Sequence, residues 1–137
     1  MSKVLVTGAT GFIGLHCIQQ LLSKGYEVNG TIRSLDREGE IRDGLSASGT
    51  SHSGLELFSV DLNSDEGWDE AMSGCEYVLH VASPISLEDQ DEDYFVKPAV
   101  AGVKRALSFA KKHSVKKVVL TSSVAAIFDT MEKKSYY

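Results

Sequence analysis

The sequence predicts an α/β protein built on a parallel sheet, because short apolar runs of strand length alternate with stretches of helical periodicity. A glycine-rich turn between the first run and the first helix supports the same class. The predicted strands are Lys3–Thr7, Glu27–Ile32, Leu55–Val60, Tyr77–Ala82 and Lys117–Thr121. Because right-handed connections join such strands, we expect a doubly wound sheet with helices on both faces and the strand order 3-2-1-4-5.

The first predicted helix is Gly11–Lys24. Its residues Ile13, Cys17 and Leu21 recur at helical spacing and predict one apolar face. Gly25 follows where a helix-ending glycine is expected.

The later helices differ in clarity. Ser34–Gly54 mixes charged residues with a Gly, Ser and Thr run at Ser46–Ser53, which predicts a weak helix followed by a flexible surface loop. A short helix is expected around Asp65–Met72. The clearest helix is Asp91–Lys112, in which apolar residues predict one stripe facing the sheet. The stripe consists of Val96, Val100, Val103, Leu107 and Ala110.

Length and composition narrow the class of protein. The 137 residues suit one domain, placed at residues 1–137, and the net charge of −5 argues against a nucleic-acid surface, which needs clustered Lys and Arg. The sequence has no signal-peptide pattern and no apolar run of membrane-spanning length. Cys17 and Cys75 lack metal-ligand spacing and are expected to be reduced. We therefore expect a cytoplasmic protein without a metal site.

The turn after the first strand carries three glycines at fixed spacing. Gly8 permits the tight turn, Gly11 lets the backbone approach a pyrophosphate, and Gly14 allows the helix to pack closely. Free amide groups and the helix dipole at this position favour an anion. The alternative is a turn that serves packing only. The strand before it, the helix after it and the second strand favour dinucleotide binding in a Rossmann-like fold.

The end of the second strand indicates the cofactor. An acidic residue that would hold a free ribose 2′-hydroxyl is missing there, and Arg33 offers a guanidinium suited to a 2′-phosphate. Arg37 is a possible second cation. The alternative is a solvated arginine at a strand end. The residues therefore favour NADP, with NAD as the second candidate.

Other polar residues at strand ends have two interpretations. Asp61 suits either an acceptor for the adenine amino group or a turn residue. By spacing alone, Ser122 and Ser123 are turn or capping residues. His80 is expected to be a hydrogen-bonded core histidine without a proton-transfer role.

Four motifs, in this order along the chain, carry a resemblance to a known family. They are Val-Thr-Gly-Ala-Thr-Gly-Phe-Ile-Gly at Val6–Gly14, Val-Asp-Leu at Val60–Leu62, His-Val-Ala-Ser-Pro at His80–Pro84 and Leu-Thr-Ser-Ser at Leu120–Ser123. Together they resemble the extended short-chain dehydrogenase/reductases, and most closely the dihydroflavonol reductase-like branch. The resemblance implies NADP(H)-dependent reduction of a small carbonyl substrate.

The resemblance also implies roles for individual residues. Ser123 would be the catalytic serine that orients the substrate. Asp61 and Leu62 would flank adenine, and Arg33 would hold the 2′-phosphate. The glycine turn would hold the pyrophosphate, and the segments after the fourth and fifth strands would pass the ribose and nicotinamide. These remaining cofactor contacts are Gly8, Thr10, Gly11, Phe12, Ile13, Gly14, Val81, Ala82, Ser83, Thr121 and Ser122.

The proton donor of the resembled family is missing. That family uses a Tyr-x-x-x-Lys pair, and no tyrosine of this sequence has a lysine four residues later; Tyr136 and Tyr137 are its last residues. We expect the cofactor-binding amino-terminal part of a reductase, truncated after about the fifth strand, without its substrate domain and inactive alone. The alternatives are a non-catalytic nucleotide-sensing module and part of a nucleotide-sugar epimerase or dehydratase.

The last predicted strand raises a question of assembly. Val118–Thr121 would form an apolar sheet edge in a sheet that ends there. Because unpaired strand edges pair with other chains, we expect possible self-association through this edge.

Overall fold

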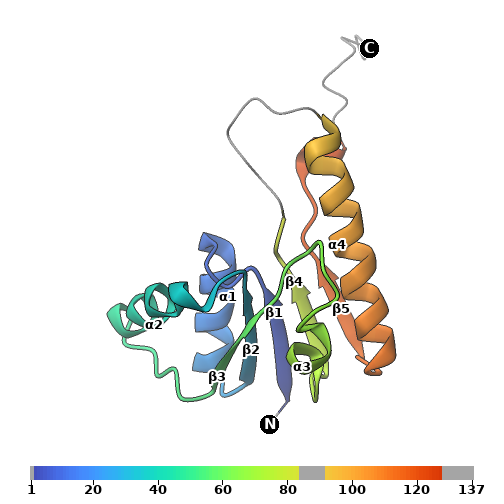
Figure 1. Ribbon diagram of the computed structural model, residues 1–137. Helices are drawn as coiled ribbons and strands as arrows, with labels where there is room; N and C mark the ends of the chain where they lie inside the picture. Colours follow the sequence, from blue (N-terminus) through green and yellow to red (C-terminus); the bar gives the residue numbers. More distant parts are fainter. Residues whose placement is uncertain (1, 84–91, 128–137) are drawn as a thin grey trace, which may run out of the picture.

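The structure is a computed structural model that describes residues 2–83 and 92–127 (Figure 1). Its sheet has five parallel strands in the order β3-β2-β1-β4-β5. They are β1 (Lys3–Thr7), β2 (Glu27–Ile32), β3 (Leu55–Ser59), β4 (Tyr77–His80) and β5 (Lys117–Leu120). This order confirms the predicted doubly wound, Rossmann-like α/β fold.

Three strands end earlier than predicted, at Ser59, His80 and Leu120. At the end of β4 a side chain takes over the hydrogen bonding: the amides of Val81 and Ala82 donate to a threonine hydroxyl, where a ladder would offer carbonyl groups. After β3 and β5 the next amide, of Val60 and of Thr121, still donates to a backbone carbonyl of the neighbouring strand. The chain therefore leaves the sheet as loops at the carboxyl edge.

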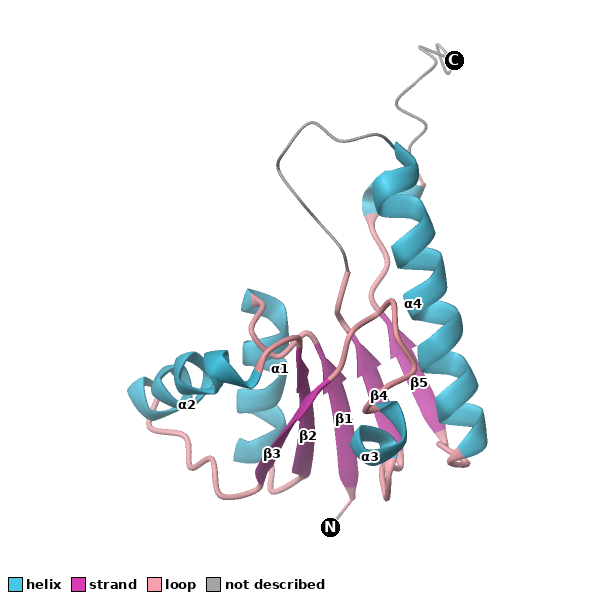
Figure 2. Ribbon diagram, viewed as in Figure 1, coloured by secondary structure: helices cyan, strands magenta, loops and turns pink. Residues whose placement is uncertain are grey.

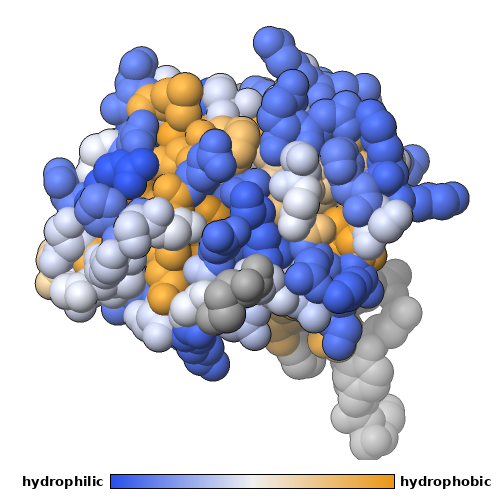
Figure 3. Space-filling model, turned by 90° about the horizontal axis from the view of Figure 1, so that it is seen from below, coloured by the Kyte–Doolittle hydropathy of each residue, from blue (hydrophilic) through white to orange (hydrophobic). Residues whose placement is uncertain are grey.

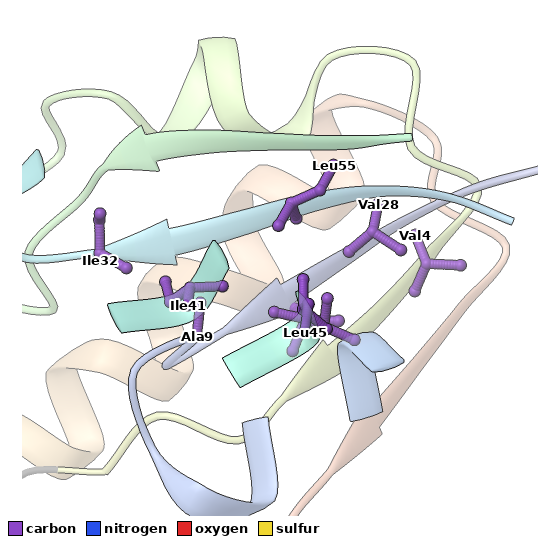
Figure 4. Close-up of a cluster of buried hydrophobic side chains, with 9 residues drawn as sticks. Val4, Ala9, Val28, Ile32, Ile41, Leu45 and Leu55 are labelled. Carbon is purple, nitrogen blue, oxygen red and sulfur yellow. The ribbon is translucent and has the colours of Figure 1, made fainter. Parts of the chain in front are cut away.

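Helices cover both faces of the sheet. They are α1 (Phe12–Ser23), α2 (Glu38–Ala47), α3 (Trp68–Met72) and α4 (Glu92–Lys112), with 3-10 helices η1 (Leu35–Arg37) and η2 (Val124–Ala126). In Figure 2, α2 lies beside α1 and α4 runs along β5. Val4 and Val6 of β1 face a core shared with α1 and α2 (Figure 4), whereas Leu5 faces a second core with α3 and α4.

The segment Ser34–Gly54 contains the predicted helix and the loop after it. The helix α2 packs into the first core, where Ile41 and Leu45 are each 1% exposed. These two residues stand four apart, so they share one face of a helix that is otherwise polar. The predicted helix followed by a loop is confirmed, and the structure adds that Ile41 and Leu45 anchor the helix in the core.

The apolar stripe predicted for α4 does not face the sheet along most of its length. Val96, Val100 and Leu107 are 45 to 47% exposed, and the small residues Gly102 and Ala106 are buried instead. A Cβ at Gly102 would lie 2.9 Å from Leu62 Cδ2, so this glycine packs closely against the segment after β3. Ala110, the last member of the predicted stripe, is buried as expected, so small residues form the inner face of this part of the helix.

The helix α3 begins at Trp68 and not at Asp65, because Gly67 adopts a left-handed φ of 80°. Trp68 is fully buried and its ring stacks on Phe109 of α4, with 6.0 Å between ring centroids. This pair joins α3 and α4 over the second core.

The opposite edge, at the amino ends of the strands, presents hydrophilic residues around hydrophobic ones (Figure 3). In the described part of the chain, no helix has both the length and the apolar character needed to cross a membrane.

Candidate dinucleotide-binding site

The strand order reverses between β1 and β4. The chain proceeds from β1 outward to β2 and β3, then returns to β4 on the other side of β1 and continues to β5. Thr7 and His80 are the last paired residues of these central strands. Ligands of doubly wound sheets bind beyond the carboxyl ends of the strands at such a reversal.

The glycine turn after β1 is fixed by packing within the chain. Gly8 has a φ of +76°, and a Cβ there would lie 3.0 Å from the Cα of Ala82. A Cβ at Gly14 would lie 2.1 Å from the carbonyl oxygen of Gly8, so the contact that needs this glycine is between α1 and the turn itself. At Gly11 a Cβ would meet only the Gly8 oxygen, at 3.3 Å. Contacts within the protein thus exclude a side chain at Gly8 and Gly14 more strictly than at Gly11.

The amino terminus of α1 is open at this edge. Its N-cap, Gly11, supplies no side-chain hydrogen bond, so the first-turn amides have no side-chain cap. Phe12 is 80% exposed and Ile13 56% exposed. Ile13, which belongs to the predicted apolar face and to the predicted cofactor contacts, lies at the mouth of the turn, and its contact with a cofactor stays a prediction. Together these groups offer N–H donors, a positive helix end and apolar surface at one point.

The loop after β4 lies against the glycine turn. Val81 and Ala82 are half-buried, and both their amides donate to Thr7 Oγ1 at 3.0 Å. Thr7 Oγ1 also lies 2.9 Å from Nδ1 of His80, which is 3% exposed. The expectation of a hydrogen-bonded core histidine is confirmed, and burial lowers the pKa of His80. Ser83 is exposed, and Pro84 lies outside the described residues.

Two arginines lie near the end of β2. Arg33 is exposed, and within residues 2–83 and 92–127 no hydrogen bond or ion pair engages its guanidinium. Arg37 reaches the half-buried Thr10 of the glycine turn, with 3.4 Å between Nη1 and Oγ1, and also bonds both carboxylate oxygens of Glu40 at 2.9 and 2.8 Å. These hydrogen bonds raise the pKa of Arg37 and lower that of Glu40. Sequence reasoning missed Glu40, although its i,i+3 spacing from Arg37 was a usable signal.

The segment after β3 shows Asp61 in a turn. Its Oδ1 accepts a hydrogen bond from the amide of Asn63 at 2.7 Å, and its carbonyl accepts one from the Trp68 indole at 3.2 Å. This is the turn interpretation, while the adenine contact stays a prediction. The half-buried Leu62 packs against Gly102 of α4, and its contact with adenine also stays a prediction.

The segment after β5 reaches the same edge. The amide of Thr121 donates to the carbonyl of His80 at 3.1 Å, which ties this segment to the centre of the sheet. Thr121, Ser122 and Ser123 are exposed, and the carbonyl of Ser123 accepts the amide of Ala126 in η2. The backbone of Ser123 thus belongs to a turn, whereas a catalytic role for its hydroxyl stays a prediction. Tyr136 and Tyr137 lie outside the described residues.

The cysteines lie away from this edge. Cys75 is buried in the second core, where burial raises its pKa to about 11, and Cys17 is half-buried on α1. Within the described residues, no group of three His, Cys, Asp or Glu side chains is placed to hold a metal ion.

Comparison with known sequences matches residues 5–137 to the 3-beta hydroxysteroid dehydrogenase/isomerase family. An anthocyanidin reductase of Arabidopsis thaliana is 40% identical over 129 residues, which are 91% of this chain and 37% of that protein. A dihydroflavonol 4-reductase of Solanum lycopersicum is 35% identical over 138 residues, which are 99% of this chain and 36% of that protein.

Among solved structures, a yeast methylglyoxal/isovaleraldehyde reductase complexed with NADPH is similar, with a TM-score of 0.82 and 33% identity. The match covers 96% of this chain and 40% of that one. The chain therefore spans well under half the length of the proteins that it matches.

Proposed function

The chain belongs to the 3-beta hydroxysteroid dehydrogenase/isomerase family, and from this premise we propose that residues 1–137 form the NADP(H)-binding domain of a reductase for a small carbonyl compound. The observation that carries the proposal is the uncapped start of α1, which opens beyond the glycine turn where the strand order reverses. The solved reductase with NADPH and the plant reductases support it.

The residues present suit a dinucleotide. Gly8 and Gly14 shape the turn, and the amides at the start of α1 would face the pyrophosphate. Asp61 would accept from adenine through its second carboxylate oxygen. A bound reduced nicotinamide supplies the hydride, and Val81 to Ser83 with Thr121 and Ser122 would line its side of the crevice.

The 2′-phosphate would lie between the two arginines at the end of β2. Arg33 has a guanidinium without a partner in the described chain, and Arg37 stands at Thr10 of the glycine turn. A 2′-phosphate would compete with Glu40 for Arg37. This pair of cations is the reason to prefer NADP over NAD.

Turnover needs a proton donor as well as a hydride. Ser123 would orient the carbonyl, but the sequence contains no Tyr-x-x-x-Lys pair to supply the proton. We therefore propose that this chain binds the cofactor without reducing a substrate. Binding without turnover would equally suit a nucleotide-sensing module. Fusing the chain to the downstream part of a relative that carries the Tyr-x-x-x-Lys pair distinguishes part of a reductase from such a module.

The test is NADPH titration of the chain and of two variants that each add one methyl group. In Gly11→Ala the new Cβ lies 3.3 Å from the nearest atom, and in Gly54→Ala, at the opposite edge, 3.4 Å. We expect saturable binding to the parent chain and to Gly54→Ala, and binding weaker by about tenfold or more in Gly11→Ala, because its Cβ stands where the pyrophosphate approaches. Methylglyoxal added to the bound chain should oxidise no NADPH above background.

Two outcomes would contradict the proposal. One is the absence of saturable binding by the folded parent chain. The other is equal affinity in all three proteins, which would move the ligand away from the turn.

The proposal extends to location and assembly. In the reducing cytoplasm Cys17 and Cys75 would remain the free thiols that the structure shows. Val119 and Leu120 of the terminal strand are 52% and 48% exposed, and the α4 residues Val96, Val100 and Leu107 are also exposed. We propose that the isolated chain self-associates through this edge.

A further inference from the structure

We propose that His80 is a positioning residue, which accepts the hydroxyl proton of Thr7 at Nδ1 and so commits both lone pairs of that hydroxyl to the loop after β4. The inference rests on the proposed function, because the loop it fixes is the one assigned to the nicotinamide side of the cofactor.

The first step is a count of hydrogen-bond groups at Thr7. A hydroxyl has one proton and two lone pairs. The amides of Val81 and Ala82 both donate to Thr7 Oγ1 at 3.0 Å, and an amide cannot accept in return. Both lone pairs are therefore used, and the proton is left for the third neighbour, His80 Nδ1, at 2.9 Å.

The second step is the protonation of the histidine. An Nδ1 that accepts a hydrogen bond carries no proton, so the ring is neutral with its proton on Nε2. Burial of His80 favours the same neutral form, since it lowers the pKa of the imidazole. A charged ring would direct an N–H at Thr7 Oγ1 and displace one of the two amides.

The third step concerns the segments that the Thr7 hydroxyl holds in place at the ends of β1 and β4. The pairing of β1 with β4 ends at Thr7 and His80, so the Thr7 hydroxyl extends this pairing by two further amides. The loop then lies against the glycine turn, with the Cα of Ala82 3.0 Å from where a Gly8 Cβ would stand. From β2, Thr31 Oγ1 accepts the amide of Gly8 at 3.3 Å. Threonine hydroxyls thus fix the two walls of the crevice relative to the sheet.

The role is positioning and not contact. Thr7 is fully buried and His80 is 3% exposed, so neither is placed to touch a ligand in the crevice. They act through Val81 and Ala82, whose backbone sets the spacing between the loop and the glycine turn. The contribution to NADPH binding should therefore follow the hydrogen-bond pattern of the side chains and not their size.

The experiment uses the whole chain and four variants. Thr7→Val removes the hydroxyl at constant shape, and Thr7→Ser keeps it. His80→Asn places an amide oxygen near the position of Nδ1, and His80→Leu removes the acceptor. Three quantities are measured: the tautomer of His80 by NMR of ¹⁵N-labelled histidine, hydrogen exchange of the Val81 and Ala82 amides, and the Kd for NADPH.

We expect the Nε2–H tautomer and protected amides in the parent chain. Thr7→Val and His80→Leu should lose amide protection and bind NADPH about tenfold more weakly, whereas Thr7→Ser and His80→Asn should stay within a few-fold of the parent. A protonated Nδ1, or full protection and affinity in His80→Leu, would overturn the inference. If Thr7→Val does not fold, the parent tautomer and the two His80 variants decide.

Failure of the proposed function would look different. If the parent chain did not bind NADPH, the proposed cofactor-binding function would be wrong. The tautomer of His80 and the amide protection would still show whether His80 orders the loop.

Discussion

Arg33 and Arg37 stand near the same strand end but in different electrostatic situations. Arg37 already has a carboxylate partner in Glu40, whereas Arg33 meets none within residues 2–83 and 92–127. A 2′-phosphate would gain a full charge-assisted contact from Arg33, but would have to share Arg37. Cofactor preference should therefore depend more strongly on Arg33.

The substitution Arg33→Ala tests this directly. We expect a loss of roughly 1.5–3 kcal/mol in NADPH binding, or about 10- to 150-fold in Kd, with little change for NADH. Arg42→Ala is the matched control, because Arg42 pairs with Glu38 on α2 away from the glycine turn. Isothermal titration with both cofactors provides the measurement, and equal losses for NADPH and NADH would argue against a 2′-phosphate at Arg33.

Sequence patterns predicted the residues of the crevice better than their bonds. The glycines and the strand ends were readable because parallel strands bring their carboxyl ends to one edge. The hydrogen bonds of the Thr7 hydroxyl could not be predicted from the sequence. They join residues 73 to 75 positions apart and depend on where β4 ends.

The elements show where periodicity succeeds and where packing overrides it. All five strands were predicted to within two residues of their ends, since buried runs leave a clear signal. Along α4 the same reasoning selected the larger apolar residues as the inner face. The structure buries Gly102 and Ala106 instead, together with the predicted Ala110, so that small side chains form the inner face.

The helix α2 provides a prediction at this scale. Leu45→Ala should lower the free energy of unfolding by about 2–4 kcal/mol, because it opens a cavity in the first core. Leu35→Ala is the control, since Leu35 is 50% exposed in η1 and should cost much less. Urea denaturation followed by circular dichroism measures both. Similar small losses would mean that α2 is not part of the core.

At the scale of the whole molecule, one edge of the sheet is unpaired among the described residues. There β5 pairs with β4 alone, and its Val119 and Leu120 are exposed, as are apolar residues of α4. Exposed apolar residues on an unpaired edge strand favour pairing with a second chain.

Light scattering at increasing protein concentration tests this association. We expect the mean mass to rise with concentration, and Val119→Lys to reduce the rise because a charge on the edge strand opposes pairing. Lys24→Ala, at the end of α1, should leave it unchanged. A monodisperse monomer at high concentration would count against the uncovered edge as an association surface.

Because β1 runs parallel to its neighbours, the chain enters the sheet at the edge away from the proposed crevice (Figure 1). Tethering the protein to a sensor chip through its amino terminus would thus leave the glycine turn facing the flowing solution. Nucleotide capture and release could then be followed on molecules held apart from one another, which separates ligand binding from any tendency of the chains to pair.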